Sequence, residues 1–551
     1  MQALDVITIL AFSIGILLTG SLFSRSGKNL NSFFAAGGAV PWWINGLSLF
    51  MGFFSAGTFV VWGSIAYTNG FVAVTIQTMM CIAGFMVAFF VAPRWHETKA
   101  LTVGEFINER LGYKVQKLYS YLFLFISVFT SGSFLYPVAK IVEMSTGLPL
   151  QTCIIILGGF SILYVTIGGL WAVVVTDVLQ FVILTVSVLV VIPLSFKKIG
   201  GVGNFLGQLP DGFTDLFNSE YTILFLVAFC LYNFCFLGGN WSYVQRYTTV
   251  SSPKNARKVG VVFGSLYVIC PLIWMLPPMI YRICNPNITG LADEGAYLLM
   301  CKEVLPAGML GMMIGGMVFA TASSLNGALN ISAGVFTNDV VRRVFPDIKE
   351  KSLMKVARIS TIGFGVLAVL VASVIPRMGG IVNVVISIAA LTGVPLYLPV
   401  ISTLFSKRQT AGSVVTATVA SLLLNAFFKF VSPSLLGFSF TRGQEMTTGV
   451  LFPVIILVIF EVWFMIRGKV DPHYEEYLAL KRAKLARKPE VAEESSDNSF
   501  SFKVIGIGIL MIGVVVMILG ALATQGRLLI ASAGLILFLM GLAIALKARK
   551  S

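Results

Sequence analysis

The chain has 551 residues, of which 57% are hydrophobic and only 11% are charged, and its mean hydropathy is +0.89. A water-soluble enzyme does not carry so much apolar sequence, so these values exclude that class. Lys and Arg exceed Asp and Glu by 39 to 24, and the resulting net charge of +15 first suggests an anionic partner such as nucleic acid, which the positions of the charges must decide.

Long apolar runs follow one another along almost the whole chain. A hydrocarbon core about 30 Å thick needs roughly 20 residues of helix, because unpaired backbone amides in lipid are costly. The chain supplies about fifteen such runs, so we predict an all-α polytopic membrane protein with about 15 transmembrane helices. The predicted spans are residues 5–22, 42–68, 71–93, 118–139, 149–168, 171–196, 222–245, 259–281, 308–340, 359–376, 380–405, 410–428, 448–466, 504–524 and 528–546. The first run follows Met-Gln-Ala-Leu-Asp, which lacks the positive region of a signal peptide, and is expected to be retained.

The basic residues are distributed unevenly between alternate loops. With the N-terminus outside, 30 of the 39 Lys and Arg residues fall in cytoplasmic segments and nine in outer segments. Lys and Arg resist translocation, so this partition predicts an outer N-terminus and a cytoplasmic C-terminus. The positive charge is therefore a topology signal, and the expected partner is the lipid bilayer of the plasma (inner) membrane rather than nucleic acid.

Two cytoplasmic segments have helical signals of their own. Thr102 and Glu105 form an S/T-x-x-E capping box, which predicts a short surface helix through Arg110. Residues 471–494 mix aromatic and basic residues, a pattern that fits either a helix lying on anionic lipid or a solvated linker.

Few residues in the spans carry chemistry. Both histidines, His96 and His473, fall in cytoplasmic loops, and the seven cysteines show no CxxC spacing, so neither catalysis nor zinc binding is supported. The main intramembrane carboxylates are Asp177 and Glu461. Glu461 lies near the edge of its span and is expected to reach the interface, whereas Asp177 lies deeper and must pair or bind an ion.

Two spans have small and polar residues at their centres, over residues 48–58 and 233–241. Transporters place their sites where helices are broken, at matching positions in two repeated halves, and these spans open successive groups of five. Small residues also occur at ordinary helix contacts, so that alternative stays open.

A third segment runs from Ala320 to Asn326. In a helix, Ser323 and Ser324 lie three and four residues after Ala320, so both hydroxyls and the Ala320 carbonyl face one point. The carbonyls of Met51 and Phe54, at a break in the second span, would complete five oxygens around that point. Na⁺ is a hard cation and prefers such ligands. A serine-rich helix contact is the alternative.

These segments resemble the sodium/solute symporter family, the group that contains bacterial sodium/galactose, sodium/proline and sodium/sialic acid carriers. The resemblance covers about residues 30–410 and rests on three motifs: Gly168-Gly169-Leu170-Trp171-Ala172 through Thr176-Asp177-x-x-Gln180, Gln245-Arg246 after Asn240-Trp241, and Ala320-x-x-Ser323-Ser324 running on to Phe336-Thr337-Asn338-Asp339.

The resemblance implies a LeuT-type core of two inverted five-helix repeats, at about 42–196 and 222–405. The expected division of the chain is an extra N-terminal helix (1–30), the first repeat (31–200), the second repeat (201–408), two additional helices (409–467), a charged cytoplasmic linker (468–503), and two C-terminal helices with a basic tail (504–551).

The resemblance also implies Na⁺ as the coupling ion. Its site maps onto the carbonyls of Met51, Phe54 and Ala320 and the hydroxyls of Ser323 and Ser324. Sialic acid carriers share the carboxylate at Asp177 but have serines where this chain has Asn326 and Gly327. One Na⁺ is therefore expected, and a second cation, or a cation exit route, at Asp177 and Asn326 is the alternative.

The solute pocket departs further from the sugar carriers. The resemblance places Phe53, Thr58, Gln77, Asn233, Phe236 and Ser387 there. A sugar needs many directed hydrogen bonds, since buried hydroxyls left unpaired cost about 1–3 kcal/mol each. This pocket offers few, so a smaller or partly apolar solute is expected, or a sugar in another pose. The partner is thus a sugar or polyol, or a small organic acid or amino-acid-like solute, and a carboxylate would need Na⁺ or helix N-termini as its counter-charge.

The predicted function is that of a sodium-coupled secondary active symporter, which imports a small organic solute by alternating access. The protein is expected to be a monomer and not an enzyme. A proton-coupled symporter is the first alternative, because Asp177 can titrate. A non-transporting solute sensor or a channel is the second, although the chain has neither a large soluble domain nor a continuous polar stripe. The sequence has no GxxxxGK[ST] nucleotide loop, which argues against a pump.

Overall fold

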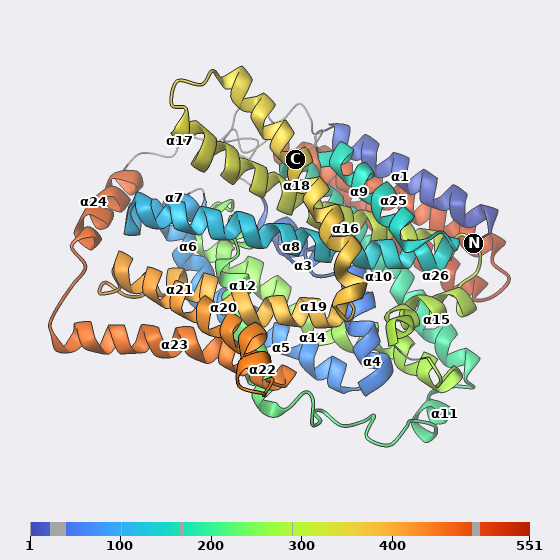
Figure 1. The fold of residues 1–551 in the computed structure, drawn as a ribbon. Helices are drawn as coiled ribbons and strands as arrows, with labels where there is room; N and C mark the ends of the chain where they lie inside the picture. The colour runs from blue at the N-terminus through green and yellow to red at the C-terminus, as the bar shows by residue number, and fades with distance from the viewer. Residues whose placement is uncertain are drawn as a thin grey trace.

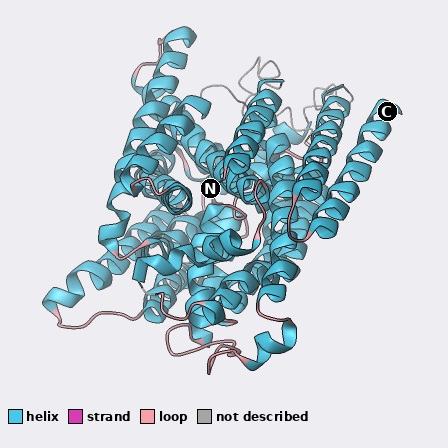
Figure 2. Ribbon diagram, turned by 90° about the vertical axis from the view of Figure 1, so that its right-hand side faces the viewer, coloured by secondary structure: helices cyan, strands magenta, loops and turns pink. Residues whose placement is uncertain are grey.

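The computed structural model of the chain describes residues 2–22, 40–100, 102–165, 170–288, 290–486 and 496–550. All regular elements in these residues are helices (Figure 2), which confirms the predicted all-α class. Eleven helices in this part of the chain are long and apolar enough to cross a membrane, and a bent pair adds a twelfth. The chain is therefore a multi-pass membrane protein. Gly168 and Gly169 of the first motif and the predicted boundary at residues 30 and 31 lie outside the described residues.

The helices follow one another along the chain, with a long connection at residues 208–222 between α11 and α12 (Figure 1). Up to residue 207 they are α1 (Ala3–Leu22), α3 (Trp42–Met51), η2 (Thr58–Trp62), α4 (Gly63–Asn69), α5 (Val72–Met86), η3 (Val87–Val91), α6 (Ala92–Thr98), α7 (Val103–Leu111), α8 (Tyr113–Thr146), α9 (Leu150–Val165), α10 (Leu170–Lys198) and α11 (Val202–Gly207). Up to residue 403 they are α12 (Ile223–Gly239), α13 (Trp241–Thr248), α14 (Pro253–Cys284), η4 (Gly290–Gly295), α15 (Ala296–Val304), α16 (Met309–Val335), η5 (Phe336–Val341), α17 (Arg342–Val344), α18 (Glu350–Val374), η6 (Ile375–Met378), α19 (Ile381–Ile388), η7 (Ala389–Gly393) and α20 (Val394–Thr403). The rest are α21 (Ala411–Ala426), η8 (Phe427–Val431), α22 (Ser432–Leu435), α23 (Arg442–Ile466), α24 (His473–Ala486), α25 (Ser496–Leu522) and α26 (Arg527–Lys550).

The span predicted over 42–68 is interrupted after α3. Residues 52–55 form turns and bends after α3, and helical geometry resumes at Ala56 and Gly57, just before the π-helical turn η2. Gly52 and Gly57 favour such a break, because glycine loses the most backbone freedom in a helix. The Thr58 side chain supports the broken segment, since its hydroxyl accepts from the Ser55 amide and donates to the Phe53 carbonyl. Two other predicted spans, at 5–22 and 149–168, have shorter apolar stretches at Ala3–Ile16 and Leu150–Ile162.

The core helices pack in two groups. One group contains α3 with α4, α5, α12 and α14, and the other contains α8, α9, α16 and α18. Helix α10 lies between them, against α3, α14 and α16. The C-terminal pair α25 and α26 packs against α10, and α21 and α23 lie on the other side of the molecule, beside α12 and α20 (Figure 1).

Helix α1 holds the start of α16. The carboxylate of Asp5, which is only 1% exposed, accepts hydrogen bonds from the amides of Gly308 (2.7 Å) and Gly311 (3.1 Å). These amides lack helical partners, so a carboxylate from another helix caps them and suits the positive end of the helix dipole. The two helices touch here, since a Cβ on Gly311 would lie 2.3 Å from the Asp5 carbonyl oxygen.

The segments predicted to be cytoplasmic also fold onto the core. Thr102 caps α7 by accepting from the Glu105 amide at 3.0 Å, which confirms the predicted surface helix. Helix α24 packs on α7, where Lys484 reaches the carboxylates of Glu105 at 2.7 Å and Glu109 at 2.6 Å. Burial raises the pKa of Glu109, and Lys484 opposes that rise. Residues 471–486 are therefore docked on α7, whereas residues 487–494 of the predicted segment lie outside the described residues.

Candidate functional site

The break after α3 faces the middle of α16. The Ala56 amide, at the end of the break, donates to the Thr321 hydroxyl at 3.0 Å, and that hydroxyl donates to the Met317 carbonyl at 2.8 Å. One threonine thus ties an unsatisfied amide of the broken span to a helix more than 260 residues away in sequence. This contact brings the carbonyls of the break and the serines of α16 into one region.

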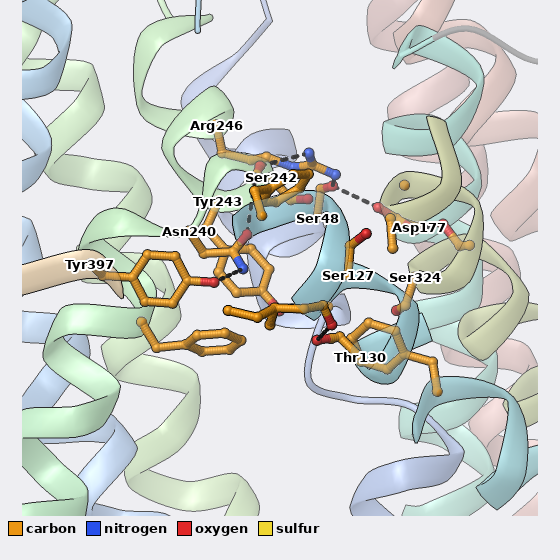
Figure 3. Close-up of a pocket in the computed structure, with 18 residues that line it drawn as sticks. Ser48, Ser127, Thr130, Asp177, Asn240, Ser242, Tyr243, Arg246, Ser324 and Tyr397 are labelled. Carbon is orange, nitrogen blue, oxygen red and sulfur yellow. Dashed lines mark hydrogen bonds between the residues drawn. The ribbon is translucent and has the colours of Figure 1, made fainter. Parts of the chain in front are cut away.

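Asp177, on α10, lies at the centre of a buried polar cluster (Figure 3). Its side chain is 3% exposed, and its two oxygens accept from the hydroxyls of Ser48 at 2.6 Å and Ser323 at 2.7 Å. The Ser48 hydroxyl also accepts from Nη2 of Arg246 at 3.3 Å, so a serine bridges the carboxylate and the guanidinium. A buried carboxylate persists only when it is paired or hydrogen-bonded. Here two hydroxyls donate to Asp177, and one of them, from Ser48, also links it to the guanidinium of Arg246.

Four of the five predicted sodium-ligand residues, Met51, Phe54, Ala320 and Ser323, are buried, and Ser324 is half-buried. Ser324 Oγ lies 3.3 Å from the Ala320 carbonyl oxygen, to which it donates. Apart from hydrogen bonds within the regular helices, no described residue donates a hydrogen bond to the carbonyl of Met51 or Phe54. Carbonyl and hydroxyl oxygens are the ligands that a hard cation prefers. Ser323 differs from the other four, because its hydroxyl is already directed at Asp177.

Asn326 lies one turn beyond Ser323 on α16. It is 2% exposed, and neither its amide oxygen nor its amide nitrogen has a hydrogen-bond partner among the described residues. The structure therefore places a free polar group at this position without bringing it to Asp177 by a hydrogen bond.

Four of the six predicted solute residues line one cavity of about 160 Å³. They are Phe53, Thr58, Asn233 and Phe236. Gln77 does not line it: its side chain is 0% exposed, and neither of its amide atoms has a partner among the described residues. Ser387 lines a different cavity, between α8, α19 and α21.

Aromatic rings form the walls of the 160 Å³ cavity, which we call the solute cavity. The Phe53 ring packs against Tyr243 at 5.0 Å and Phe236 at 6.1 Å, and Tyr232 stacks on Phe236 at 5.5 Å. Most aliphatic hydroxyls in the wall donate to carbonyls of their own segment; these are Thr58 to Phe53, Thr130 to Ile126, Ser133 to Phe129 and Thr392 to Ile388. Such hydroxyls are no longer free donors for a sugar.

A smaller cavity of about 70 Å³, here called the ion cavity, adjoins the solute cavity. Its lining includes Asp177, Arg246 and Ser324 (Figure 3). The two cavities share seven lining residues, which are Gly52, Ile126, Thr130, Phe134, Phe236, Tyr243 and Tyr397. We call this shared wall the junction.

A second broken span supports the junction. Helices α12 and α13 meet at Asn240 with a bend of 60°. The Asn240 side chain accepts from the Ser242 amide at 3.0 Å, which caps α13, and donates to the Tyr397 hydroxyl at 3.1 Å (Figure 3). The preceding Gly239 allows close contact with Tyr397, since a Cβ on it would lie 2.6 Å from the tyrosine Cβ.

Reasoning from sequence missed Arg246, Tyr243 and Tyr397 as site residues. The charge count assigned Arg246 to a cytoplasmic segment, whereas the structure buries its guanidinium beside Ser48. A signal existed in the Gln245-Arg246 motif after the second break. No comparable signal marks Tyr397, which lies more than 150 residues from its partner Asn240.

Comparisons with known proteins agree with this architecture. The model of the sodium:solute symporter family matches residues 33–419. The chain is 27% identical over 498 residues to the sodium/glucose cotransporter of Vibrio parahaemolyticus, covering 83% of this chain and 90% of that protein. It is 25% identical over 430 residues to the sodium/sialic acid symporter of Proteus mirabilis, with 74% and 86% covered. Human sodium/myo-inositol cotransporter 2 is 25% identical over 466 residues, with 76% and 69% covered.

A solved structure has the same fold. It is the substrate-bound outward-open state of a Na⁺-coupled sialic acid symporter, which aligns with a TM-score of 0.72 at 21% identity. The alignment covers 84% of this chain and 98% of the other.

Proposed function

Because the chain belongs to the sodium:solute symporter family, we propose that it is a secondary active symporter that uses the Na⁺ gradient to import a small organic solute by alternating access. The family consists of transporters, so the chain is not an enzyme, and Na⁺ is the coupling ion. We place the protein in the plasma (inner) membrane as a monomer, with its N-terminus outside and its C-terminus in the cytoplasm.

The proposed core consists of two inverted repeats at 31–200 and 201–408, with about 15 transmembrane helices in the whole chain. The packing supports this division. The first two spans of each half form one group of helices, and the third and fourth spans of each half form the other. Each half also begins with a broken span. The remaining proposed parts are the N-terminal helix (1–30), two added helices (409–467), the linker (468–503) and the C-terminal pair (504–551).

The proposed Na⁺ site consists of the carbonyls of Met51, Phe54 and Ala320 with the hydroxyls of Ser323 and Ser324. The contact that carries this proposal is the hydrogen bond from Ala56 to Thr321, because it holds the break against α16. Na⁺ bound between them stabilises the conformation in which the two are apposed, and a ligand shifts a population by its difference in affinity for the two states.

The proposed solute-binding residues are Phe53, Thr58, Asn233 and Phe236 in the wall of the solute cavity. Gln77 and Ser387 stay in the proposal as residues of a second conformation, since alternating access changes which side chains face the cavity. Asp177 and Asn326 are proposed as a second cation site or a route for Na⁺ release.

The ion site can be tested without knowing the solute. The melting midpoint of the purified protein is measured against NaCl, with KCl keeping the ionic strength constant. A ligand that binds only the folded state stabilises it by about 2.7 kcal/mol at a hundred times its Kd. We expect a rising midpoint with NaCl, and at least an approximately tenfold weaker Na⁺ response in Ser324→Ala, which corresponds to about 1.4 kcal/mol.

Ser332→Ala is the matched control. Ser332 is buried on the same helix and also donates to the carbonyl four residues before it, at 2.8 Å. It should keep the wild-type Na⁺ response. An unchanged response in Ser324→Ala would refute the site, and a midpoint that follows pH but not NaCl would favour proton coupling through Asp177.

A further inference from the structure

The charged groups around the two cavities are few and can be counted. Asp177 and Arg246 are the only charged side chains in the lining of the ion cavity, and the described lining of the solute cavity has none. The negative charge of Asp177 balances the positive charge of Arg246, and Ser48 hydrogen-bonds to both side chains. A bound Na⁺ therefore leaves the combined site with one net positive charge, and charge held away from water needs a counter-charge.

The two tyrosines of the junction carry hydroxyl donors that have no acceptor among the described residues. Tyr243 and Tyr397 line both cavities, and Tyr232 lines the solute cavity. Among the described residues, none of these three hydroxyls donates a hydrogen bond, although Tyr397 accepts one from Asn240. Arg246 adds a buried Nε–H that has no partner among the described residues. Phenol and guanidinium donors form their strongest hydrogen bonds with anions.

The solute cavity itself favours an apolar body. Its aliphatic hydroxyls Thr58, Thr130 and Thr392 are committed to backbone carbonyls, and eight of its 24 lining residues are aromatic. A polyol bound there would leave several hydroxyls unpaired. The volume of about 160 Å³ matches a single ring or a short branched chain, since an apolar protein cavity of about 150 Å³ holds one benzene molecule.

We propose that the solute is a small monocarboxylate with an apolar body. Its carboxylate lies at the junction, where Tyr243 and Tyr397 donate to it and Arg246 with bound Na⁺ balances its charge. Its body lies between Phe53 and Phe236. This inference rests on the proposed sodium-coupled symport, and it differs from the sugars and sialic acid named for the relatives. One Na⁺ and one carboxylate together neutralise the site, so transport at that ratio moves no net charge.

The test uses the purified full-length protein and four probes: benzoate, 3-methylbutanoate, the neutral benzamide, and galactose. Melting midpoints are measured for each probe in NaCl and in KCl. We expect benzoate or 3-methylbutanoate to raise the midpoint in NaCl, with at least tenfold weaker binding in KCl. Benzamide should bind at least tenfold more weakly than benzoate, because it has the same ring without the charge.

Tyr243→Phe removes one donor and is expected to weaken benzoate binding five- to tenfold while leaving the response to NaCl alone unchanged. Tyr247→Phe is the matched control, since Tyr247 is buried on the same short helix but lines neither cavity. It should not change benzoate binding.

A transport measurement gives an independent result. In proteoliposomes with a Na⁺ gradient, labelled benzoate uptake should be unaffected by a membrane potential set with K⁺ and valinomycin. Stabilisation by galactose or benzamide equal to that by benzoate would overturn the inference, as would the failure of both carboxylates. A protein that responds to NaCl alone but to neither carboxylate would refute the solute class while supporting the sodium site.

Discussion

The ion cavity and the solute cavity lie side by side, yet their walls are built in opposite ways. Around Asp177, polar side chains from α3, α10, α13 and α16 hydrogen-bond to one another across the helices. Around Phe53, the hydroxyls donate within their own segments and present apolar surface to the cavity. The first wall depends on long-range contacts between side chains, and the second depends on ring packing.

This difference separates what the two cavities can recognise. A network of buried, mutually bonded polar groups holds a charge in one place and tolerates little change, because each lost partner leaves another group unsatisfied. Aromatic walls select by shape and apolar area, and they tolerate exchange of one residue for another of similar size. We therefore expect changes in the two walls to separate Na⁺ binding from solute binding.

The largest effect is expected from Asp177→Asn. The substitution keeps the shape but removes the negative charge, so Ser48 and Ser323 lose their charged acceptor and Arg246 loses its counter-charge. We expect Na⁺ stabilisation to weaken by about 100-fold, a difference of about 2.7 kcal/mol. Melting midpoints in NaCl and KCl measure this change.

The same variant also tests the charge balance. Without the carboxylate, Arg246 leaves one positive charge in the site before any Na⁺ binds. Benzoate binding to Asp177→Asn should therefore occur equally in KCl and NaCl. If the variant keeps the wild-type Na⁺ response, the Asp177 carboxylate does not contribute to Na⁺ binding.

The converse change is Phe53→Ala on the solute side. Removing a buried aromatic side chain costs about 3–5 kcal/mol of stability in protein cores. Part of that free energy comes here from contacts with the bound solute, so benzoate binding should weaken by about tenfold to 100-fold. The NaCl response should stay at the wild-type value. Phe53→Leu, which restores most of the apolar volume, is expected to recover much of the binding. Equal losses of Na⁺ and benzoate binding would show that the two walls are not separable.

Much of the fold follows from patterns that are local in sequence. Apolar runs predict the long helices, and the small residues at 52–57 and 238–240 predict where two spans break. The docking of α24 was not predictable in this way. It depends on Lys484 meeting Glu105 and Glu109 from more than 370 residues away, and a charge pattern alone fits lipid, solvent or protein equally well.

The site shows the same limit more sharply. Helical spacing predicts that Ser324 lies near the Ala320 carbonyl, and the structure places them 3.3 Å apart. Spacing says nothing about Ser323 meeting Asp177 across 146 residues. Whether a residue that aligns with a pocket position faces the cavity also depends on packing, which is why Gln77 lies buried away from the solute cavity. The family's motifs indicated which distant segments meet at the site, and helical periodicity does not contain that information.

A smaller effect is expected at Asn240, which lines the ion cavity and donates to Tyr397 in the shared wall. Replacing it with alanine removes the cap of α13 and the hydrogen bond to Tyr397, and a lost cap costs about 1 kcal/mol. Asn240→Ala should therefore weaken Na⁺ and benzoate binding together, each by about fivefold. Thr222→Ala removes the cap at the other end of the α12–α13 pair, where the side chain accepts from the Phe225 amide at 3.2 Å. It should lower the melting midpoint by a similar amount without changing either affinity.

The smallest effect is expected outside both cavities, at the loop η4. Glu294 accepts from the Ile381 amide at 2.9 Å, at the start of α19, and from the Tyr136 hydroxyl of α8 at 3.0 Å. The neighbouring Asp293 accepts from Ser64 of α4 at 2.7 Å. Burial raises the pKa of Glu294, while the Ile381 amide, the Tyr136 hydroxyl and Lys140 oppose the rise and Asp293 adds to it.

A carboxyl whose pKa is raised by burial favours the folded conformation in its protonated form. Its stabilising contribution is present at low pH and is lost as the pH rises through the raised pKa. The melting midpoint should therefore be higher at mildly acidic pH than at alkaline pH. Glu294→Gln resembles the protonated form and should flatten that dependence, whereas Asp211→Asn, at an exposed carboxylate, should not. Because Asp293 and Glu294 line neither cavity, Na⁺ and benzoate affinities at fixed pH should be unchanged in Glu294→Gln. A shift in only one of them would mean that the loop acts on that cavity alone.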